Sequence, residues 1–552
     1  MTCFQSKEVC LYILCFVFLV FSCKHKEVGE REGKTVFRYN ESAGISSLDP
    51  SFARNVENIW AINQLFNGLV QMNDKLEVEP CIGRSWEISM DGLTYTFHLR
   101  DDVYFHDHEL FEGGKGRKVV ASDFVYSFYR IVDPEVASPG AWIFNNIDKP
   151  DDQGFKAVND STFQIHLLKP FPPFLGLLTM QYCSVVPKEI VKYYGRDFRN
   201  NPVGTGPFIF KMWKEGVKLI FVKNENYFEK DEEGNALPYL DAVSISFLSE
   251  IQVVFLEFVK GDLDFLSGLD EIPKDEVLSQ TGDLKPIYQN RFRLYLQPYL
   301  KTDYIGILVD QKLEVVQNSP LKIKAVRQAI NYGIDRKTMV TYLMNNIGTP
   351  ANSGIVPLGL PSYNAENVKG YYYHPDRARK LLIDAGFPNG EGLQEITLVT
   401  SSDFLDMCEF IQHQLSNIGI KIKIDVNKPV NLRDMVAKST VNMFRKNWIA
   451  DYADAENYLA MFYSKNFSPS GPNYTHFKND RFDELYEKSQ LEINDTLRYE
   501  YYRQMDQIVM DEAPVVVLFY DQVLRLVQNN ITGLGSNPMN LLTLKRVKKV
   551  VD

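Results

Sequence analysis

An alternating pattern of apolar and polar residues follows the dipeptide Asp91-Gly92. Every second residue from Leu93 to Leu99 is apolar, which is the period of a strand with one buried face. The Asp-Gly pair favours a type I′ hairpin turn, in which both central residues have positive φ. We therefore predict a β-hairpin here, and a helix with Ser122 as its N-cap further along the chain.

Strand and helix periods alternate between residues 396 and 426. Ile396 to Thr400 is a short apolar strand, residues 403–418 carry apolar side chains at helical spacing, and residues 420–426 alternate strictly. Strand, helix and strand with short connections form a βαβ unit, which predicts parallel strands in an α/β fold. Further helices are expected within 322–344 and 374–386, and a buried strand over 514–520.

The chain opens with an apolar run from Leu11 to Phe21. It is shorter than the roughly 20 residues that span a bilayer, but it fits the apolar region of a signal peptide. Ser22 and Cys23 follow in the sequence V-F-S-C, which resembles a bacterial lipobox. We expect a signal over 1–23, a lipid anchor on Cys23 and a charged, flexible tether over 24–33. Cleavage without lipidation stays open as the alternative.

Length, charge and cysteine content narrow the class of protein. A chain of 552 residues is too long for one compact core, so several domains are expected. The formal net charge of −11 argues against nucleic acid as a partner. After Cys23 only Cys81, Cys183 and Cys408 remain, which is no disulfide framework.

Motifs for catalysis are absent from the sequence. It contains no serine-hydrolase elbow, no zinc-peptidase motif and no phosphate-binding loop. Residues 106–109 (H-D-H-E) follow a predicted strand and precede a Gly-rich turn, so we interpret them as a hairpin end rather than a metal site. We therefore expect no enzymatic activity, no catalytic residue, no metal site and no cofactor.

Six segments occur in one order along the chain: Ser85 to Asp107, Gly116 to Ile131, Asn201 to Phe208 (N-P-V-G-T-G-P-F), Val326 to Arg336, Ala378 to Phe387 and Trp448 to Asp454 (W-I-A-D-Y-A-D). Together they resemble the family 5 extracytoplasmic solute-binding proteins, the oligopeptide- and dipeptide-binding components of ABC importers. The resemblance extends over nearly the whole chain after the predicted signal.

This resemblance implies an α/β, two-lobed periplasmic-binding-protein fold, type II-like, with an extra inserted domain and two hinge strands. Lobe I would comprise residues 34–72, 201–297 and 519–552. The inserted domain would comprise 73–200, and lobe III would comprise 298–518. Two chain crossings would let the lobes close on a ligand at their interface.

The resemblance also implies a ligand site. In similar oligopeptide binders the Asp of W-x-A-D-Y holds the α-ammonium group of the ligand, and here that residue is Asp451. Trp448 and Tyr452 would wall the site. An ion pair between Asp451 and a neighbouring Lys or Arg is the alternative interpretation. We expect Asp454 and Glu456, in the same segment, to be structural or rim residues.

Two further segments are expected to border the ligand. Arg54, Asn55 and Val56 follow the S-L-D-P turn, where the ligand-lining loop of similar proteins runs. The positive charge of Arg54 would favour a ligand carboxylate or a shorter peptide. Trp142 lies where the inserted domain would approach the ligand, and it could equally be a core residue.

The resemblance therefore implies an exported lipoprotein, facing the periplasm or the cell exterior, that captures short peptides and delivers them to ABC permease subunits. We expect it to act as a monomer. Two alternatives stay open. The same scaffold could bind another solute, such as a nickel complex, haem, an opine or an oligosaccharide. It could also be a lipoprotein that senses peptides instead of importing them.

Overall fold

The computed structural model describes residues 33–148, 154–268 and 271–550. Cys23, the predicted signal and all but the last residue of the predicted tether lie outside the described residues. Within the described part of the chain, no helix has the length and apolar character needed to cross a membrane.

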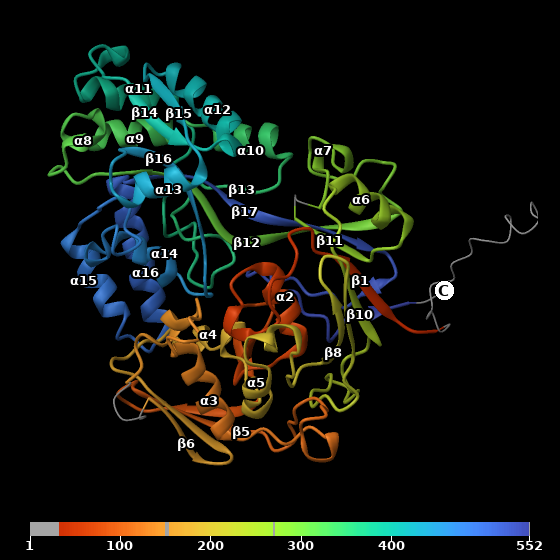
Figure 1. The fold of residues 1–552 in the computed structure, drawn as a ribbon. Coiled ribbons are helices and arrows are strands. Elements are labelled where there is room, and N and C mark those ends of the chain that lie inside the picture. Colours follow the sequence, from red (N-terminus) through yellow and green to blue (C-terminus); the bar gives the residue numbers. More distant parts are fainter. Residues whose placement is uncertain (1–32, 149–153, 269–270, 551–552) are drawn as a thin grey trace, which may run out of the picture.

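An 11-stranded sheet forms the centre of the molecule (Figure 1). Ten strands follow one order: β15 (Ile422–Val426), β14 (Ile396–Thr400), β16 (Met443–Ile449), β12 (Phe292–Ile307), β17 (Val515–Gln528), β11 (Phe265–Ser267), β1 (Val36–Asn40), β10 (Ala242–Ser246), β9 (Lys218–Lys223) and β8 (Phe208–Lys214). The remaining strand, β13 (Thr349–Pro350), pairs with β17. Helices pack beside these strands, so the predicted α/β class is confirmed.

The predicted βαβ unit lies at one edge of this sheet. β14 and β15 pair in parallel, with Ile396 opposite Ile422, and α12 (Leu405–Ser416) connects them. The helical region 322–344 is divided into α9 (Lys324–Tyr332) and α10 (Arg336–Met344). The division has a local cause, because the Asp335 carboxylate accepts a hydrogen bond from Thr338 N at 3.0 Å and caps α10.

β12 and β17 are long antiparallel strands that belong to both halves of the sheet. Their register shifts twice, first between the pairs Pro298–Gln522 and Thr302–Tyr520 and again between Asp303 and Tyr304. On one side of the first shift β17 also pairs with β11, and on the other side β12 also pairs with β16. The predicted lobe limits at 297/298 and 518/519 fall within these two strands, and the limits themselves stay a prediction.

A smaller four-stranded sheet occupies the segment predicted to be inserted (Figure 1). Its order is β4 (Gly83–Ile88), β5 (Thr94–Leu99), β7 (Thr162–His166) and β6 (Phe155–Asn159), and α3 (Ala121–Val132) packs on it. The predicted β-hairpin is β4–β5, but its predicted turn type is wrong. Only Gly92 has positive φ, at 70°, because Asp91 instead accepts a hydrogen bond from Leu93 N at 3.0 Å.

The predicted N-cap of α3 is also wrong. The helix begins at Ala121, with Val120 in the N-cap position and Ser122 inside the first turn. The Asp123 carboxylate accepts a hydrogen bond from Val120 N at 3.0 Å, and it also binds Arg117. An acidic side chain in the first turn therefore caps this helix by accepting from the N-cap N–H, whereas an N-cap serine would accept from N–H groups inside the helix.

Two large cores lie on either side of the crossing strands. One core extends from Phe37 in β1 to Phe163 in β7, so the segments predicted to form lobe I and the inserted domain share buried contacts. A second core surrounds Ile305, Leu398 and Tyr458 in the other half of the sheet. Tyr452 is an exception, because it comes from the second half of the sheet and packs into the first core.

The V-G-T-G-P-F motif fixes α2 (Val56–Leu65) against the sheet. A Cβ at Gly204 would lie 2.1 Å from the Leu65 carbonyl oxygen, and one at Gly206 would lie 2.4 Å from the Leu65 carbonyl carbon. Only glycine permits this close approach. His106 stabilises the same loop, because its ring lies 3.0 Å from the Gly206 carbonyl oxygen and burial lowers its pKa to about 4.

Candidate functional site

The loop that carries Asp451 is held against the crossing strand β12. β16 ends at Ile449, and the next residue, Ala450, donates its N–H to the Leu300 carbonyl at 2.9 Å. The Tyr458 hydroxyl donates to the same carbonyl at 2.6 Å. Leu300 lies within the first register shift of β12 and β17, so the Asp451 loop leaves the sheet where its two halves join.

Asp451 is exposed, and no ion pair among the described residues involves it. The ion pair with Lys or Arg, left open by the sequence, is therefore not seen in this part of the chain. Desolvation by the surrounding segments raises the pKa of its carboxyl, while the Asn457 amide lowers it. Asn457 also accepts a hydrogen bond from Trp448 Nε1 at 2.7 Å. Asn457 thus connects Trp448 with Asp451.

The other two acids of this segment are bonded inside the protein. Asp454 is buried and lies 3.4 Å from Arg498 in α16 (Asp495–Glu512). Glu456 is also buried and accepts hydrogen bonds from the hydroxyl groups of Tyr452 and Tyr486. These contacts hold the ring of Tyr452 in one position, and they leave Asp451 as the exposed acid of the three.

Trp142 comes from the inserted segment and lies next to Tyr452. It is part of a short helical turn, η3 (Ala141–Phe144), and 37% of it is exposed. Its ring centroid is 6.3 Å from that of Tyr452, with an angle of 36° between the rings. This distance is within the range of aromatic contacts. The inserted segment and the Asp451 loop therefore meet through two aromatic rings.

Arg54 and Asn55 are exposed, and Val56 is half-buried at the start of α2. Tyr182 connects this loop with Asp451. Burial raises the pKa of Tyr182 to about 12, the positive charge of Arg54 lowers it, and the negative charge of Asp451 raises it. Both charges thus lie within electrostatic range of one hydroxyl group, although they come from distant parts of the sequence.

Sequence reasoning missed two residues of this site, Tyr182 and Asn457. Asn457 stands within the acidic, aromatic-rich segment, so its position alone could have drawn attention to it. Tyr182 belongs to a short turn, η5 (Gln181–Cys183), where no periodic pattern or motif marks it. Its role depends on contacts that only the folded chain creates.

A cavity of about 670 Å³ adjoins the site at Tyr452. It lies between the inserted segment and the beginning of α16, and its lining includes Tyr95, Pro170, Leu175, Tyr452, Asp454 and Arg498. Its walls come from both sides of the Trp142–Tyr452 contact, so its volume depends on how these two parts of the molecule approach each other.

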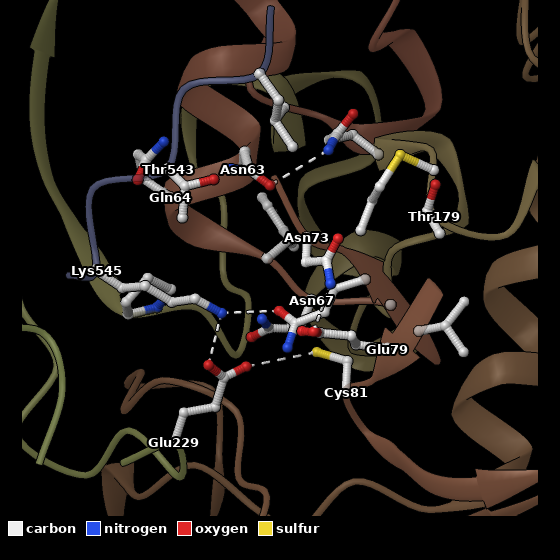
Figure 2. Close-up of a pocket in the computed structure, with 18 of the residues that line it drawn as sticks. Asn63, Gln64, Asn67, Asn73, Glu79, Cys81, Thr179, Glu229, Thr543 and Lys545 are labelled. Carbon is white, nitrogen blue, oxygen red and sulfur yellow. Dashed lines mark hydrogen bonds and ion pairs between the residues drawn. The ribbon is translucent and has the colours of Figure 1, made fainter. Parts of the chain in front are cut away.

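A second pocket, of about 210 Å³, lies apart from the predicted site residues and is shown in Figure 2. Lys545 Nζ donates to Gln71 at 2.7 Å and to Glu229 at 2.5 Å. Burial raises the pKa of the nearby Cys81 thiol to about 12. These polar groups bond with one another, which indicates a structural role for them.

Chemistry for metal binding is not found in the described part of the chain, where no three His, Cys, Asp or Glu side chains are grouped to hold an ion. His106 makes its contacts with the backbone of the V-G-T-G-P-F loop. The candidate site instead offers one carboxylate, one guanidinium and several aromatic rings. Such a site suits binding of a charged organic molecule.

Known proteins are similar to this sequence over most of its length. Heme-binding protein A of Haemophilus influenzae is 28% identical over 82% of this chain and 80% of its own. The periplasmic oligopeptide-binding protein OppA of Salmonella typhimurium is 27% identical over 92% of this chain and 91% of its own. The solved structure of DppA from Helicobacter pylori, in complex with the peptide STSA, has a TM-score of 0.70 and 26% identity, covering 93% of this chain and 98% of that one.

The family described as bacterial extracellular solute-binding proteins, family 5, matches residues 77–470, which is more than half of the chain. Its members bind solutes, so the match confirms the expectation of a binding protein rather than an enzyme. The predicted two-lobed fold agrees with the shared sheet and with the solved structure. The chain belongs to the family 5 bacterial extracellular solute-binding proteins.

Proposed function

We propose that the protein captures short peptides between its two lobes and delivers them to the permease of an ABC importer. The support is the family membership, the names of relatives that bind peptides, and the chemistry of the Asp451 site. In this proposal the protein performs no reaction. It closes on a ligand, shields it from solvent and docks to the permease.

The observation that carries the proposal is the carboxylate of Asp451, which lacks an ion-pair partner among the described residues. Although Asp451 is exposed to solvent, the segments around it partly desolvate its carboxyl and raise its pKa, which disfavours the charged form. A peptide α-ammonium group offers a positive charge and three donors, so it would relieve this cost. Trp448, Tyr452 and Trp142 would exclude water around the pair, which strengthens it.

The rest of the peptide would be held by contacts that do not depend on its side chains. Main-chain hydrogen bonds can hold an extended peptide like an added strand. Arg54 would attract a carboxylate of the ligand, since its positive charge and the negative charge of Asp451 both act on Tyr182. Asn55 and Val56, at the start of α2, would border the same space.

Lipidation of Cys23 would keep the protein at the membrane that contains the permease, and the charged residues after it would act as a tether. Mass spectrometry of the purified full-length protein tests this part. A mature N-terminus at Cys23 with added acyl mass is expected. Cleavage without acyl mass would leave an exported but unanchored protein.

Titration calorimetry tests the main proposal. A pool of short peptides is compared with the same pool after N-acetylation, which removes the ammonium charge. Binding of the free peptides and weak or absent binding of the acetylated ones is expected. Equal binding of both pools would remove Asp451 from the proposed role, while no binding of either pool would contradict peptide capture itself.

A second candidate function is the binding of a non-peptide solute. It is favoured by the relative named heme-binding protein A, whose sequence matches over most of this chain. Native mass spectrometry of the protein, purified from its own host, distinguishes the two candidates. A set of bound peptides supports peptide capture, and one bound mass with the absorption spectrum of haem supports the alternative.

A further inference from the structure

Three glutamates lie near one another at the carboxyl ends of parallel strands. Glu41 directly follows β1, Glu271 follows β11, and Glu57 stands in the first turn of α2. β1 pairs in parallel with β10 and with β11. The carboxyl ends of parallel strands are where open α/β sheets place their ligands. The group is therefore located where lobe I can contact a ligand.

Glu41 is the residue that distinguishes this group from a solvated acidic patch. Only 7% of Glu41 is exposed, and its Oε1 has no hydrogen-bond partner among the described residues. Burial raises its pKa well above the ordinary value, and the negative charges of Glu271 and Glu57 raise it further. The fully buried hydroxyl of Tyr39 also lacks a hydrogen-bond partner in this part of the structure. A buried acceptor without a donor costs free energy, which a bound donor would recover.

Neighbouring bonds hold the acids in place. The Asn40 amide donates to Glu271 Oε1 at 2.9 Å, and Ser42 N donates to the same oxygen at 3.3 Å. Glu41 N donates to the Ser246 carbonyl at 2.9 Å. Three consecutive residues, Asn40, Glu41 and Ser42, thus fix the positions of two carboxylates relative to the end of the sheet.

A chain of electrostatic contacts leads from these acids to the Asp451 site. Burial raises the pKa of Tyr299 in β12, Lys301 lowers it, and Asp521 and Glu57 raise it. Burial also raises the pKa of Tyr458, and Tyr299 and Asp451 raise it further. Glu57 and Asp451 therefore act on two tyrosines that meet at β12, because the Tyr458 hydroxyl donates to the carbonyl of Leu300, the residue after Tyr299.

The arrangement indicates which kind of ligand group could donate a hydrogen bond to Glu41. The described residues contain no group of three acids or other ligands placed to hold a metal ion. These carboxylates thus do not converge on one point, and a side chain that ends in several N–H donors can reach acceptors that lie apart. Lysine and arginine side chains have this form.

We propose that Glu41, Glu57 and Glu271 form a subsite for the ammonium or guanidinium group of a basic side chain, so that the protein prefers peptides that contain lysine or arginine. The inference rests on the proposed peptide-binding function and specifies its substrate class. In this subsite the half-buried Glu57 makes the first contact, and the buried Glu41 and Glu271 lie behind it.

Calorimetry with tripeptides tests the inference on the mature protein. Trialanine is compared with alanine peptides that carry lysine at each position in turn, and with the matching norleucine peptides, which have nearly the same length but no charge. At least one lysine peptide is expected to bind about ten- to a hundredfold tighter than its norleucine counterpart, the range for a hydrogen bond to a charged group. Glu41→Gln should abolish this preference and leave the affinity for trialanine within about twofold.

Glu232→Gln is the matched control, because Glu232 is an exposed lobe I glutamate and the charge change is the same. Glu57→Gln is the second variant, should Glu41→Gln lower the melting temperature. Equal binding of lysine and norleucine peptides at every position would overturn the inference and keep peptide capture. A melting temperature raised by millimolar calcium, without lysine preference, would also overturn it. Binding of no peptide at all would instead contradict the proposed function on which the inference rests.

Discussion

The ring of Trp142 lies 6.3 Å from the ring of Tyr452, centroid to centroid. Trp142 comes from the inserted segment, and Tyr452 comes from the loop that follows β16. Glu456 fixes Tyr452 by accepting a hydrogen bond from its hydroxyl group. Trp142, in contrast, is 37% exposed. The contact is thus made by one immobilised ring and one ring that solvent reaches.

Trp142 is expected to report ligand binding by its fluorescence. Closure of the lobes changes the surroundings of a half-exposed indole, so wild-type protein should show a change in emission on adding peptide. Trp142→Phe should remove most of that change and keep the ring contact. Trp213→Phe is the control, since Trp213 lies in β8, at the end of the strand order opposite to β15. A change that survives Trp142→Phe but not Trp213→Phe would contradict this assignment.

Asp451→Asn is expected to weaken peptide binding by about 2–5 kcal/mol, because it removes one charge of the pair with the ligand ammonium. The variant should melt no lower than wild type, since desolvation already disfavours the charged carboxylate. Calorimetry and thermal melting measure the two effects. Asp384→Asn, at an exposed position of α11 (Pro375–Asp384), is the control. A variant with unchanged affinity would disprove the role of Asp451.

Glu456→Ala is expected to destabilise the protein by about 1–3 kcal/mol, because it leaves the buried hydroxyls of Tyr452 and Tyr486 without their acceptor. It should also weaken peptide binding, since Tyr452 loses its fixed position. Urea unfolding measures the first effect. Glu487→Ala removes an exposed partner of Lys465 and should cost less than about 1 kcal/mol. Equal losses for both variants would contradict this account.

Asp506 should make stability depend on pH in an unusual direction. Burial raises its pKa to about 7, while hydrogen bonds from Ile355 N and Val356 N lower it. The folded-state pKa lies above the unfolded value, so the folded protein binds a proton more tightly. The stabilisation is complete below about pH 4 and is lost as the pH rises to about 7.

Asp506→Asn cannot ionise, and it isolates this effect. Wild type should lose stability between about pH 4 and pH 7, and the variant should not. The difference in unfolding free energy, variant minus wild type, should therefore increase by roughly 2–4 kcal/mol over this range. Chemical unfolding across this range provides the measurement. A constant difference between the two proteins would show that Asp506 ionises alike in the folded and unfolded states.

Arg54→Gln is expected to weaken the binding of peptides with a free carboxyl terminus. Arg54 makes no ion pair among those seen in the described part of the chain, so its charge is available to a ligand carboxylate. Peptides with an amidated carboxyl terminus should bind both proteins equally. Calorimetry with matched free and amidated peptides tests this. Equal weakening of both peptides would assign Arg54 to packing rather than charge.

Local patterns in the sequence predicted much of the fold. Alternation from Leu93 to Leu99 located β5, and the apolar run from Ile396 to Thr400 gave the limits of β14. These features depend on neighbouring residues only. The turn at Asp91 and the cap at Ser122 were wrong because side-chain hydrogen bonds of Asp91 and Asp123 compete with the expected conformations.

The site was less predictable, since it depends on contacts between distant segments. The resemblance to a family indicated Asp451, Tyr452 and Trp142, and the fold brings Trp142 to Tyr452. Tyr182 and Glu41 carried no such signal. Segments that are distant in the sequence surround these two residues, and such contacts cannot be predicted from periodicity or motif spacing.

The first register shift in β12 and β17, between Pro298 and Thr302, has a mechanical consequence. Both connections between the halves of the sheet are hydrogen-bonded strands, so a change in the angle between the halves must bend or twist the backbone near Pro298 and Thr302. The hydrogen-bonded strands oppose large changes in this angle and restore it afterwards. The two crossing segments are paired strands and not flexible loops, so they are poor substrates for proteases. This suits a protein that works outside the cell.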